Sequence, residues 1–201
     1  DNITDDDVVG LEKVNDESIS VEKTLAIGKM ENDTVLKDDG NSFGDLANLI
    51  KNAVPGSTIY LDKNYYADEN YEKSGIVIDK DLTIDGQGYQ INGQDNCRLV
   101  NVQSGTVTFI NVFFIGGRIN SENGGAIFAT NNTIILNSVF DNNNANKSGG
   151  AVYVHDAFSN SIIDSEFINN SAKNGGAIYF NGETNNVTIS GNFKGNDAER
   201  A

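Results

Sequence analysis

Acidic side chains are the first candidates for chemistry, because glycosidases act with two carboxylates about 5–9.5 Å apart. Asp164 and Glu166 stand two residues apart, so on a strand they would share one face. His155 and Asp156 are the best available acid–base pair. The alternative is that these residues lie on a solvated strand face. Arginine occurs only at positions 98, 118 and 200, so a cluster that clamps an anionic substrate is not expected. We therefore expect no catalytic residue and no enzyme.

Metal and redox chemistry are limited by the scarcity of cysteine and histidine. Cys97 has no partner for an internal disulfide, and one histidine cannot complete a cysteine–histidine metal site. Oxygen ligands remain possible, and Asp79-Lys80-Asp81 could hold Ca²⁺ in principle. This segment is better explained as a turn before Leu82. We therefore expect no cofactor and no metal, and we expect Cys97 to be a small buried thiol.

The net charge excludes two classes of partner. Lys and Arg number 14 against 29 Asp and Glu, which gives a net charge of −15. Such a chain repels phosphate backbones and anionic membrane surfaces, and no apolar run approaches the roughly 20 residues that span a bilayer. We therefore expect no nucleic-acid binding and no direct membrane insertion by this chain. It opens on Asp1-Asn2-Ile3 without a basic segment, so we expect any secretory signal to have been removed.

The first forty residues hold 12 acids and 4 lysines, over half of the net charge. We predict an acidic tail over residues 1–41, partly extended where apolar residues alternate between 19 and 27. Residues 42–56 predict a short amphipathic helix. Ser42 and Asp45 form an acidic variant of the capping box, and Pro55-Gly56 ends the helix. The apolar positions of the helix are Phe43, Leu46, Leu49, Ile50 and Val54.

Two motifs recur along the rest of the chain at intervals of 25–27 residues. Gly-Gly-Ala, then an apolar and an aromatic residue, occurs at 124–128, 149–153 and 175–179. Phe-x-x-Asn follows each of them, at 140–143, 167–170 and 193–196. The Gly-Gly and Asn clusters would break helices, whereas short strands with Asn and Gly corners fit a chain that bends three times per repeat.

These repeats predict an all-β parallel β-helix of about five coils over residues 57–201, with the helix at 42–56 as a cap on the first coil. Equivalent side chains would then stack one rung apart, about 4.8 Å along the axis. We expect one inner stack of Phe113, Phe140, Phe167 and Phe193. We expect a second inner column of Ile84, Phe109, Leu136, Ile163 and Ile189. Asn143, Asn170 and Asn196 would form a ladder at one corner, each amide bonded to the next. Because Phe193 is still in register near residue 201, we expect further coils or domains to follow.

The motifs resemble two related families over roughly residues 42–196. Gly-Gly-Ala-[Ile/Val] paired with Phe-x-x-Asn is similar to the polymorphic outer-membrane protein repeat of surface adhesins. The Ser42 helix, the strand at 57–61 and Leu82-Thr83-Ile84-Asp85-Gly86 resemble the N-terminal part of adhesin-like proteins of methanogenic archaea. The resemblance implies a right-handed β-helix of the pectin-lyase-like class, displayed on the cell exterior and anchored by regions outside this chain. It implies adhesion to the glycans or proteins of other cells, but fold alone does not carry that function.

The aromatic residue of each Gly-Gly-Ala motif is the candidate ligand contact. If Ile127, Val152 and Ile178 point inward, strand alternation turns Phe128, Tyr153 and Tyr179 outward, with His155 on the same side. In the opposite register those aromatics lie inside and the surface column disappears. The chain also carries sequons for N-glycosylation, four of them in the coil corners, at Asn131, Asn146, Asn169 and Asn186. A lyase or glycosidase of the pectin-lyase-like class and a non-binding structural stalk remain the alternatives to an adhesin.

Overall fold

The computed structural model describes residues 42–155, 161–182 and 187–199. The chain divides by its contacts into two units, 1–39 and 40–201, and every described residue lies in the second. The predicted acidic tail, with its alternating segment at 19–27, lies outside the described residues, as does Asn186.

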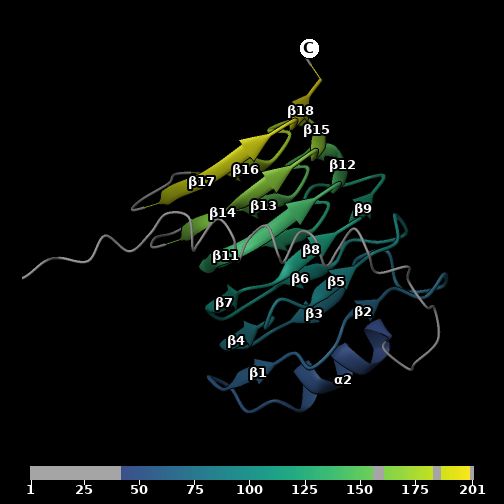
Figure 1. Ribbon diagram of the computed structural model, residues 1–201, viewed down its shortest axis with the longest axis vertical. Coiled ribbons are helices and arrows are strands. Elements are labelled where there is room, and N and C mark those ends of the chain that lie inside the picture. The colour runs from purple at the N-terminus through teal and green to yellow at the C-terminus, as the bar shows by residue number, and fades with distance from the viewer. Residues whose placement is uncertain (1–41, 156–160, 183–186, 200–201) are drawn as a thin grey trace, which may run out of the picture. The chain divides into compact units, whose positions relative to one another are not determined.

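The second unit is a parallel β-helix of about five turns, in which each turn adds one rung to three sheets (Figure 1). All paired strands are parallel, and we name the sheets A, B and C. Sheet A holds β1 (Thr58–Tyr60), β2 (Tyr65–Tyr66), β4 (Leu82–Asp85), β5 (Gln90–Asn92), β7 (Val107–Ile110), β8 (Phe113–Ile115), β11 (Thr133–Asp141), β14 (Ile162–Ile168) and β17 (Thr188–Lys194). Sheet B holds β3 (Ile76–Ile78), β6 (Val100–Val102), β10 (Ile127–Ala129), β13 (Val152–His155) and β16 (Ile178–Asn181). Sheet C holds β9 (Arg118–Ile119), β12 (Asn144–Ser148), β15 (Ser171–Asn174) and β18 (Asp197–Ala198). The predicted fold class is therefore confirmed.

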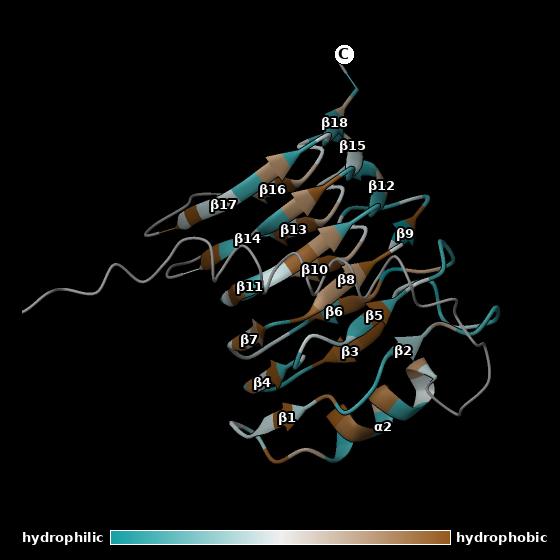
Figure 2. Ribbon diagram, viewed as in Figure 1, coloured by the Kyte–Doolittle hydropathy of each residue, from teal (hydrophilic) through white to brown (hydrophobic). Residues whose placement is uncertain are grey.

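The core runs along the helix axis as columns of equivalent apolar side chains, and Figure 2 shows apolar stretches on strands of successive turns. The phenylalanine stack has near-parallel rings 4.6–4.9 Å apart, but its first member is Phe114, where we expected Phe113. Phe113 pairs with Val139 on the outer face instead. The second column is also corrected by one residue, because Ile135 pairs with both Phe109 and Ile163, whereas Leu136 pairs with Ile110 and Asp164.

An extra residue explains both corrections. Asn111 and Asn137 have φ of 53° and 49°, in the left-handed region that asparagine tolerates better than most residues. Each adds one residue between the two inner columns of its coil, so that Phe109 and Phe114 stand five apart while Ile163 and Phe167 stand four apart. The strand pairing shifts by one residue beside Asn137.

The Gly-Gly-Ala motif lies where the backbones of successive coils approach each other closely. Its first glycine has positive φ in all three copies, between 58° and 69°. A Cβ on the second glycine has no room, since at Gly150 it would lie 2.0 Å from the carbonyl oxygen of Gly176. The alanine that follows is buried in every copy. The repeat therefore uses glycine for close approach at each rung.

The asparagine ladder forms as predicted at the corner between sheets A and C. Oδ1 of Asn170 accepts hydrogen bonds from the backbone N–H and the side-chain Nδ2 of Asn143, each 3.0 Å long. Asn196 receives the same pair of bonds from Asn170. Each Nδ2 also donates to a phenylalanine carbonyl of the preceding coil, as Asn170 does to Phe140 at 3.0 Å. Gly117 begins the ladder by donating its N–H to Asn143.

The only helix of the described residues, α2 (Phe43–Asn52), packs on the first coil near β2 and β3. Ser42 and Asp45 form the predicted capping box. Phe43, Leu46 and Ile50 are buried in the same core cluster as the strands, whereas Leu49 and Val54 are exposed. The helix ends at Asn52, before Pro55-Gly56, and Lys80 donates to the carbonyls of Lys51 and Ala53.

We predict that Asn170→Ala lowers the free energy of unfolding by about 2–4 kcal/mol, because it leaves buried donors of the adjoining coil without acceptors. Urea denaturation followed by circular dichroism measures the change. Asn192→Ala, on the exposed last strand of sheet A, is the control and should change stability by no more than about 0.5 kcal/mol. Equal effects of the two substitutions would show that the ladder does not stabilise the fold.

Candidate functional site

The aromatic residues predicted to contact a ligand form one column on sheet B. Phe128 pairs in register with Tyr153, and Tyr153 with Tyr179. Their rings stack at 5.3 Å and 5.7 Å between centroids, with interplanar angles of 12° and 1°. Their neighbours Ile127 and Val152 belong to the core cluster, so the aromatic rings project from the other face of the sheet.

The stacking covers both ring faces of Tyr153 and one ring face each of Phe128 and Tyr179. Tyr153 is only 5% exposed between its two neighbours, and Phe128 and Tyr179 are half-buried. The guanidinium of Arg98 lies 5.0 Å from the centroid of the Phe128 ring. His155 lies 6.2 Å from Tyr153 and pairs in register with Asn181. Sugar rings stack on ring faces, so this arrangement adds little support, and ligand binding by these four residues stays a prediction.

Arg98 is a buried charged side chain that no sequence pattern predicted. It is 1% exposed and donates to the carbonyl oxygens of Ser74, Asn123 and Gly124 at 2.8–3.2 Å. It also forms a 2.8 Å ion pair with Glu122, whose side chain is 58% exposed. Burial lowers the pKa of Arg98, and the hydrogen bond and charge of Glu122 oppose that change. Arg98 therefore ties three successive coils together.

Cys97, the residue before Arg98, is buried as expected. Burial raises the pKa of its thiol to about 11, and the nearby charge of Lys73 only partly opposes this. Cys97 is therefore a neutral core residue near pH 7.

The acidic candidates do not come together. Asp164 is exposed and pairs in register with Leu136 and Ser190, and Glu166 pairs with Val139 and Asn192. The corrected register thus replaces some of the neighbours expected from the spacing. Asp85 stands in the same column as Asp164, but Ile110 and Leu136 lie between them, so no third carboxylate is a register neighbour of the pair in the described coils. Asp156 lies outside the described residues, so its pairing with His155 is not tested.

The Asp79-Lys80-Asp81 segment is a turn between β3 and β4. Asp81 accepts a hydrogen bond from the backbone N–H of Thr106 at 2.7 Å, and the carbonyl of Asp79 accepts one from Ser104. These bonds hold the turn against the next coil. Among the described residues, no group of three or more His, Cys, Asp or Glu side chains could hold a metal ion.

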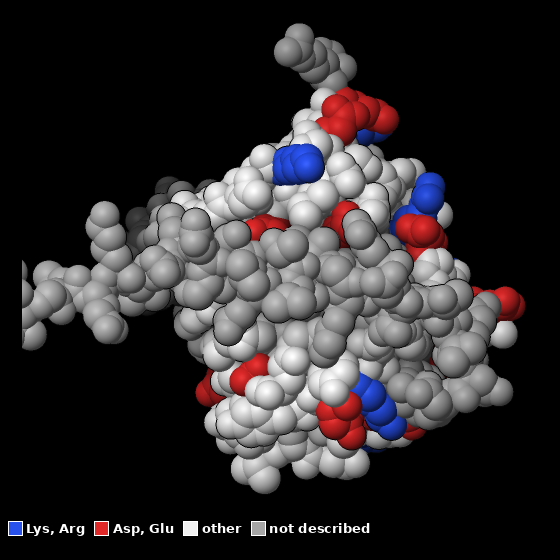
Figure 3. Space-filling model, viewed as in Figure 1, with Lys and Arg blue, Asp and Glu red and all other residues white. Residues whose placement is uncertain are grey.

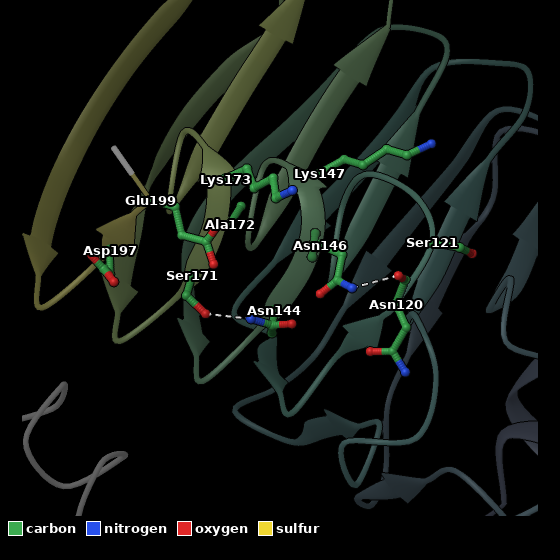
Figure 4. A pocket seen from close by; sticks show the side chains of 11 residues that line it. Asn120, Ser121, Asn144, Asn146, Lys147, Ser171, Ala172, Lys173, Asp197 and Glu199 are labelled. Carbon is green, nitrogen blue, oxygen red and sulfur yellow. Dashed lines mark hydrogen bonds between the residues drawn. The ribbon is translucent and has the colours of Figure 1, made fainter. Parts of the chain in front are cut away.

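A polar groove of about 490 Å³ lies over sheet C (Figure 4). Its amide and hydroxyl side chains come from Asn120, Ser121, Asn144, Asn146 and Ser171. Its charged side chains are Lys147, Lys173, Asp197 and Glu199, and the small side chains of Ala145 and Ala172 complete the lining. The residues come from consecutive coils, and all but the two alanines are polar.

Hydrogen bonds fix part of the groove wall. Nδ2 of Asn144 donates to Oγ of Ser171 at 2.6 Å, and Nδ2 of Asn146 donates to the carbonyl of Asn120 at 2.7 Å (Figure 4). Oδ1 of Asn144 is buried and has no hydrogen-bond partner among the described residues. This groove was not predicted from the sequence. The signal was present, because Asn144, Ser171 and Asp197 each directly follow a ladder asparagine.

Three of the predicted glycosylation sites lie on described residues. Asn146 and Asn169 are exposed, and Asn131 is half-buried with its Nδ2 donating to the carbonyl of Gln103. The hydroxyl residues of two sequons, Thr133 and Ser148, are buried in the folded protein. Glycosylation at Asn131, Asn146, Asn169 and Asn186 stays a prediction.

The face seen in Figure 3 is mostly uncharged where its atoms belong to described residues, with a few acidic and basic side chains scattered over it. No helix among the described residues is long and apolar enough to cross a membrane.

Comparison with known families identifies the repeats. The model of the Chlamydia polymorphic membrane protein repeat matches residues 137–155 and 164–181. Each match contains one Phe-x-x-Asn motif and the Gly-Gly-Ala motif that follows it. The chain therefore carries repeats of the polymorphic-membrane-protein type on a β-helix. Searches of curated proteins and of solved structures gave no match.

We predict that Arg98→Lys lowers the free energy of unfolding by about 2–4 kcal/mol, because lysine cannot reach the carbonyls of the preceding and the following coil at once. Glu122→Gln should cost about 1 kcal/mol or less, since the carboxylate is mostly exposed. Urea denaturation of both variants measures the difference. A larger loss from Glu122→Gln than from Arg98→Lys would contradict the assigned role of the carbonyl contacts.

Proposed function

We propose that this chain is the binding domain of a cell-surface adhesin, which attaches to glycans or proteins of other cells. The observation that carries the proposal is that the coils matched by the polymorphic-membrane-protein repeat also build the polar groove over sheet C. Asn144, Lys147 and Ser171 line the groove and lie in or between the two matched segments. A solenoid that brings polar groups of consecutive coils side by side offers an extended surface, as repeat proteins commonly do for their partners.

An extracellular location follows from the same proposal. The name of the matched repeat is that of a membrane protein, and a net charge of −15 disfavours contact with nucleic acids and anionic lipids. Regions outside this chain would anchor it. If the cell that makes the protein glycosylates it, the exposed Asn146 and Asn169 are the accessible acceptors.

The proposal is tested by binding of the purified chain to whole cells and to a glycan array. An adhesin domain should bind at least one cell type or glycan class above the level of a matched unrelated acidic protein. Absence of binding to every cell and every glycan would contradict the proposal and favour a structural stalk. Release of unsaturated uronates from an acidic polysaccharide would instead show a lyase.

A variant separates specific adhesion from general adsorption. Asn170→Asp keeps a similar shape but removes donors from the buried ladder, so the coils that carry the groove should be disturbed. We expect cell binding to fall with the folded fraction of this variant. Full binding by the unfolded protein would mean that the β-helix is not the binding element.

A further inference from the structure

The groove over sheet C brings together two lysines that have no ionic partner among the described residues. Lys147 lies on β12 and Lys173 on the neighbouring strand β15, and both are exposed. The ion pair of Arg98 with Glu122 involves neither lysine. Two lysines on adjacent strands are notable in a chain where acids outnumber bases by 29 to 14.

An irregularity in the pairing of β12 with β15 sets the position of Lys147 relative to Lys173. Asn144 and Ala145 pair in register with Ser171 and Ala172, but Ser148 then pairs with Asn174. Asn146 and Lys147 together thus lie opposite Lys173. A bulge of this kind inserts one residue and changes the direction of a side chain, and bulges occur often beside functional sites. Figure 4 shows Lys147 and Lys173 extending from neighbouring strands at the groove.

The coil that follows adds the opposite charge beside Lys173. Asp197 and Glu199 come from the next coil, where Asp197 pairs with Ser171 and Ala198 with Ala172. Neither carboxylate forms an ion pair with a lysine of the groove within the described residues. On the strands that carry the two lysines, Asn144, Asn146 and Ser171 line the groove with amide and hydroxyl groups, of which Oδ1 of Asn144 is buried. Such groups both donate and accept, which suits ligand hydroxyls.

We propose that this groove binds an extended anionic glycan, with a carboxylate or sulfate at Lys147 and Lys173 and sugar hydroxyls along the asparagines and toward Asp197 and Glu199. This inference rests on the proposed adhesin function and assigns the ligand class to one surface. Lysine binds carboxylate and sulfate as a point charge, and the two carboxylates set the direction of the ligand. A polymer that repeats its groups matches a groove that repeats rungs at about 4.8 Å.

The charges of the two lysines determine how ligand binding should depend on salt. The whole chain is acidic, so an anionic ligand is attracted only within about 8–10 Å of the lysine pair at ordinary ionic strength. Binding should therefore weaken steeply with added salt, and it should be lost when the two charges are removed.

The test uses the full chain and calorimetric titration with three probes: an oligogalacturonate hexasaccharide, a sulfated heparin hexasaccharide and a neutral cello-oligosaccharide of similar length. The wild-type protein should bind at least one anionic probe at least tenfold more tightly than the neutral one. Lys147→Gln combined with Lys173→Gln should weaken that binding at least tenfold. Lys51→Gln combined with Lys194→Gln makes the same change in net charge away from the groove, and it should leave the affinity within twofold.

Several results would overturn the inference. These are unchanged binding by the groove variant, equal losses in the groove and control variants, and a polyglutamate peptide that binds as tightly as the anionic glycans. Whole-cell binding separates this failure from that of the adhesin proposal. A groove variant that still binds cells and glycans like wild type leaves the adhesin proposal standing and removes the groove, whereas wild-type protein that binds nothing removes both.

Discussion

Each coil of this protein is held to the next by hydrogen bonds and side-chain contacts that repeat in register. At the corner between sheets A and C, Asn170 joins three coils by itself, since its amide bonds to Asn143, Asn196 and the carbonyl of Phe140. The phenylalanine rings beside it stack 4.6–4.9 Å apart, close to the rung spacing that the backbone imposes. Because every coil must satisfy the same spacing, the repeat keeps glycine where two backbones touch and asparagine where a buried corner needs four hydrogen bonds.

The same constraint organises the outer surface. Side chains that project from the core columns are also brought into register, so single residues of the sequence become columns in space. On sheet B the aromatic rings stack face to face on one another, and Arg98 lies over Phe128. On sheet C it opens a groove, because the side chains there are short or polar and the floor is alanine. Binding capacity therefore depends on which residue types occupy a column, while the column itself follows from the fold.

The repeat motifs were sufficient to predict the fold, the asparagine ladder and the capping helix, because each depends on residue types at a fixed interval. Register within a coil was not fully predictable. Phe113 and Phe114 are adjacent and chemically equal, and only the left-handed Asn111 decides which of them enters the stack. Arg98 could not be found at all, since its partners are mostly backbone carbonyls of coils about 24–26 residues away. The groove was not predicted, because its asparagines and lysines follow the ladder and belong to none of the acidic or aromatic columns.

The most direct test is nuclear Overhauser spectroscopy on the protein with specifically labelled phenylalanine, isoleucine and asparagine. Stacked coils require strong cross-peaks between the rings of Phe140 and Phe167, whose centroids lie 4.8 Å apart, and between the side chains of Ile135 and Ile163. They also require a cross-peak between the side-chain amide protons of Asn143 and Asn170. Well-dispersed spectra that lack all three contacts would contradict the β-helix, together with the groove and the functions assigned to it.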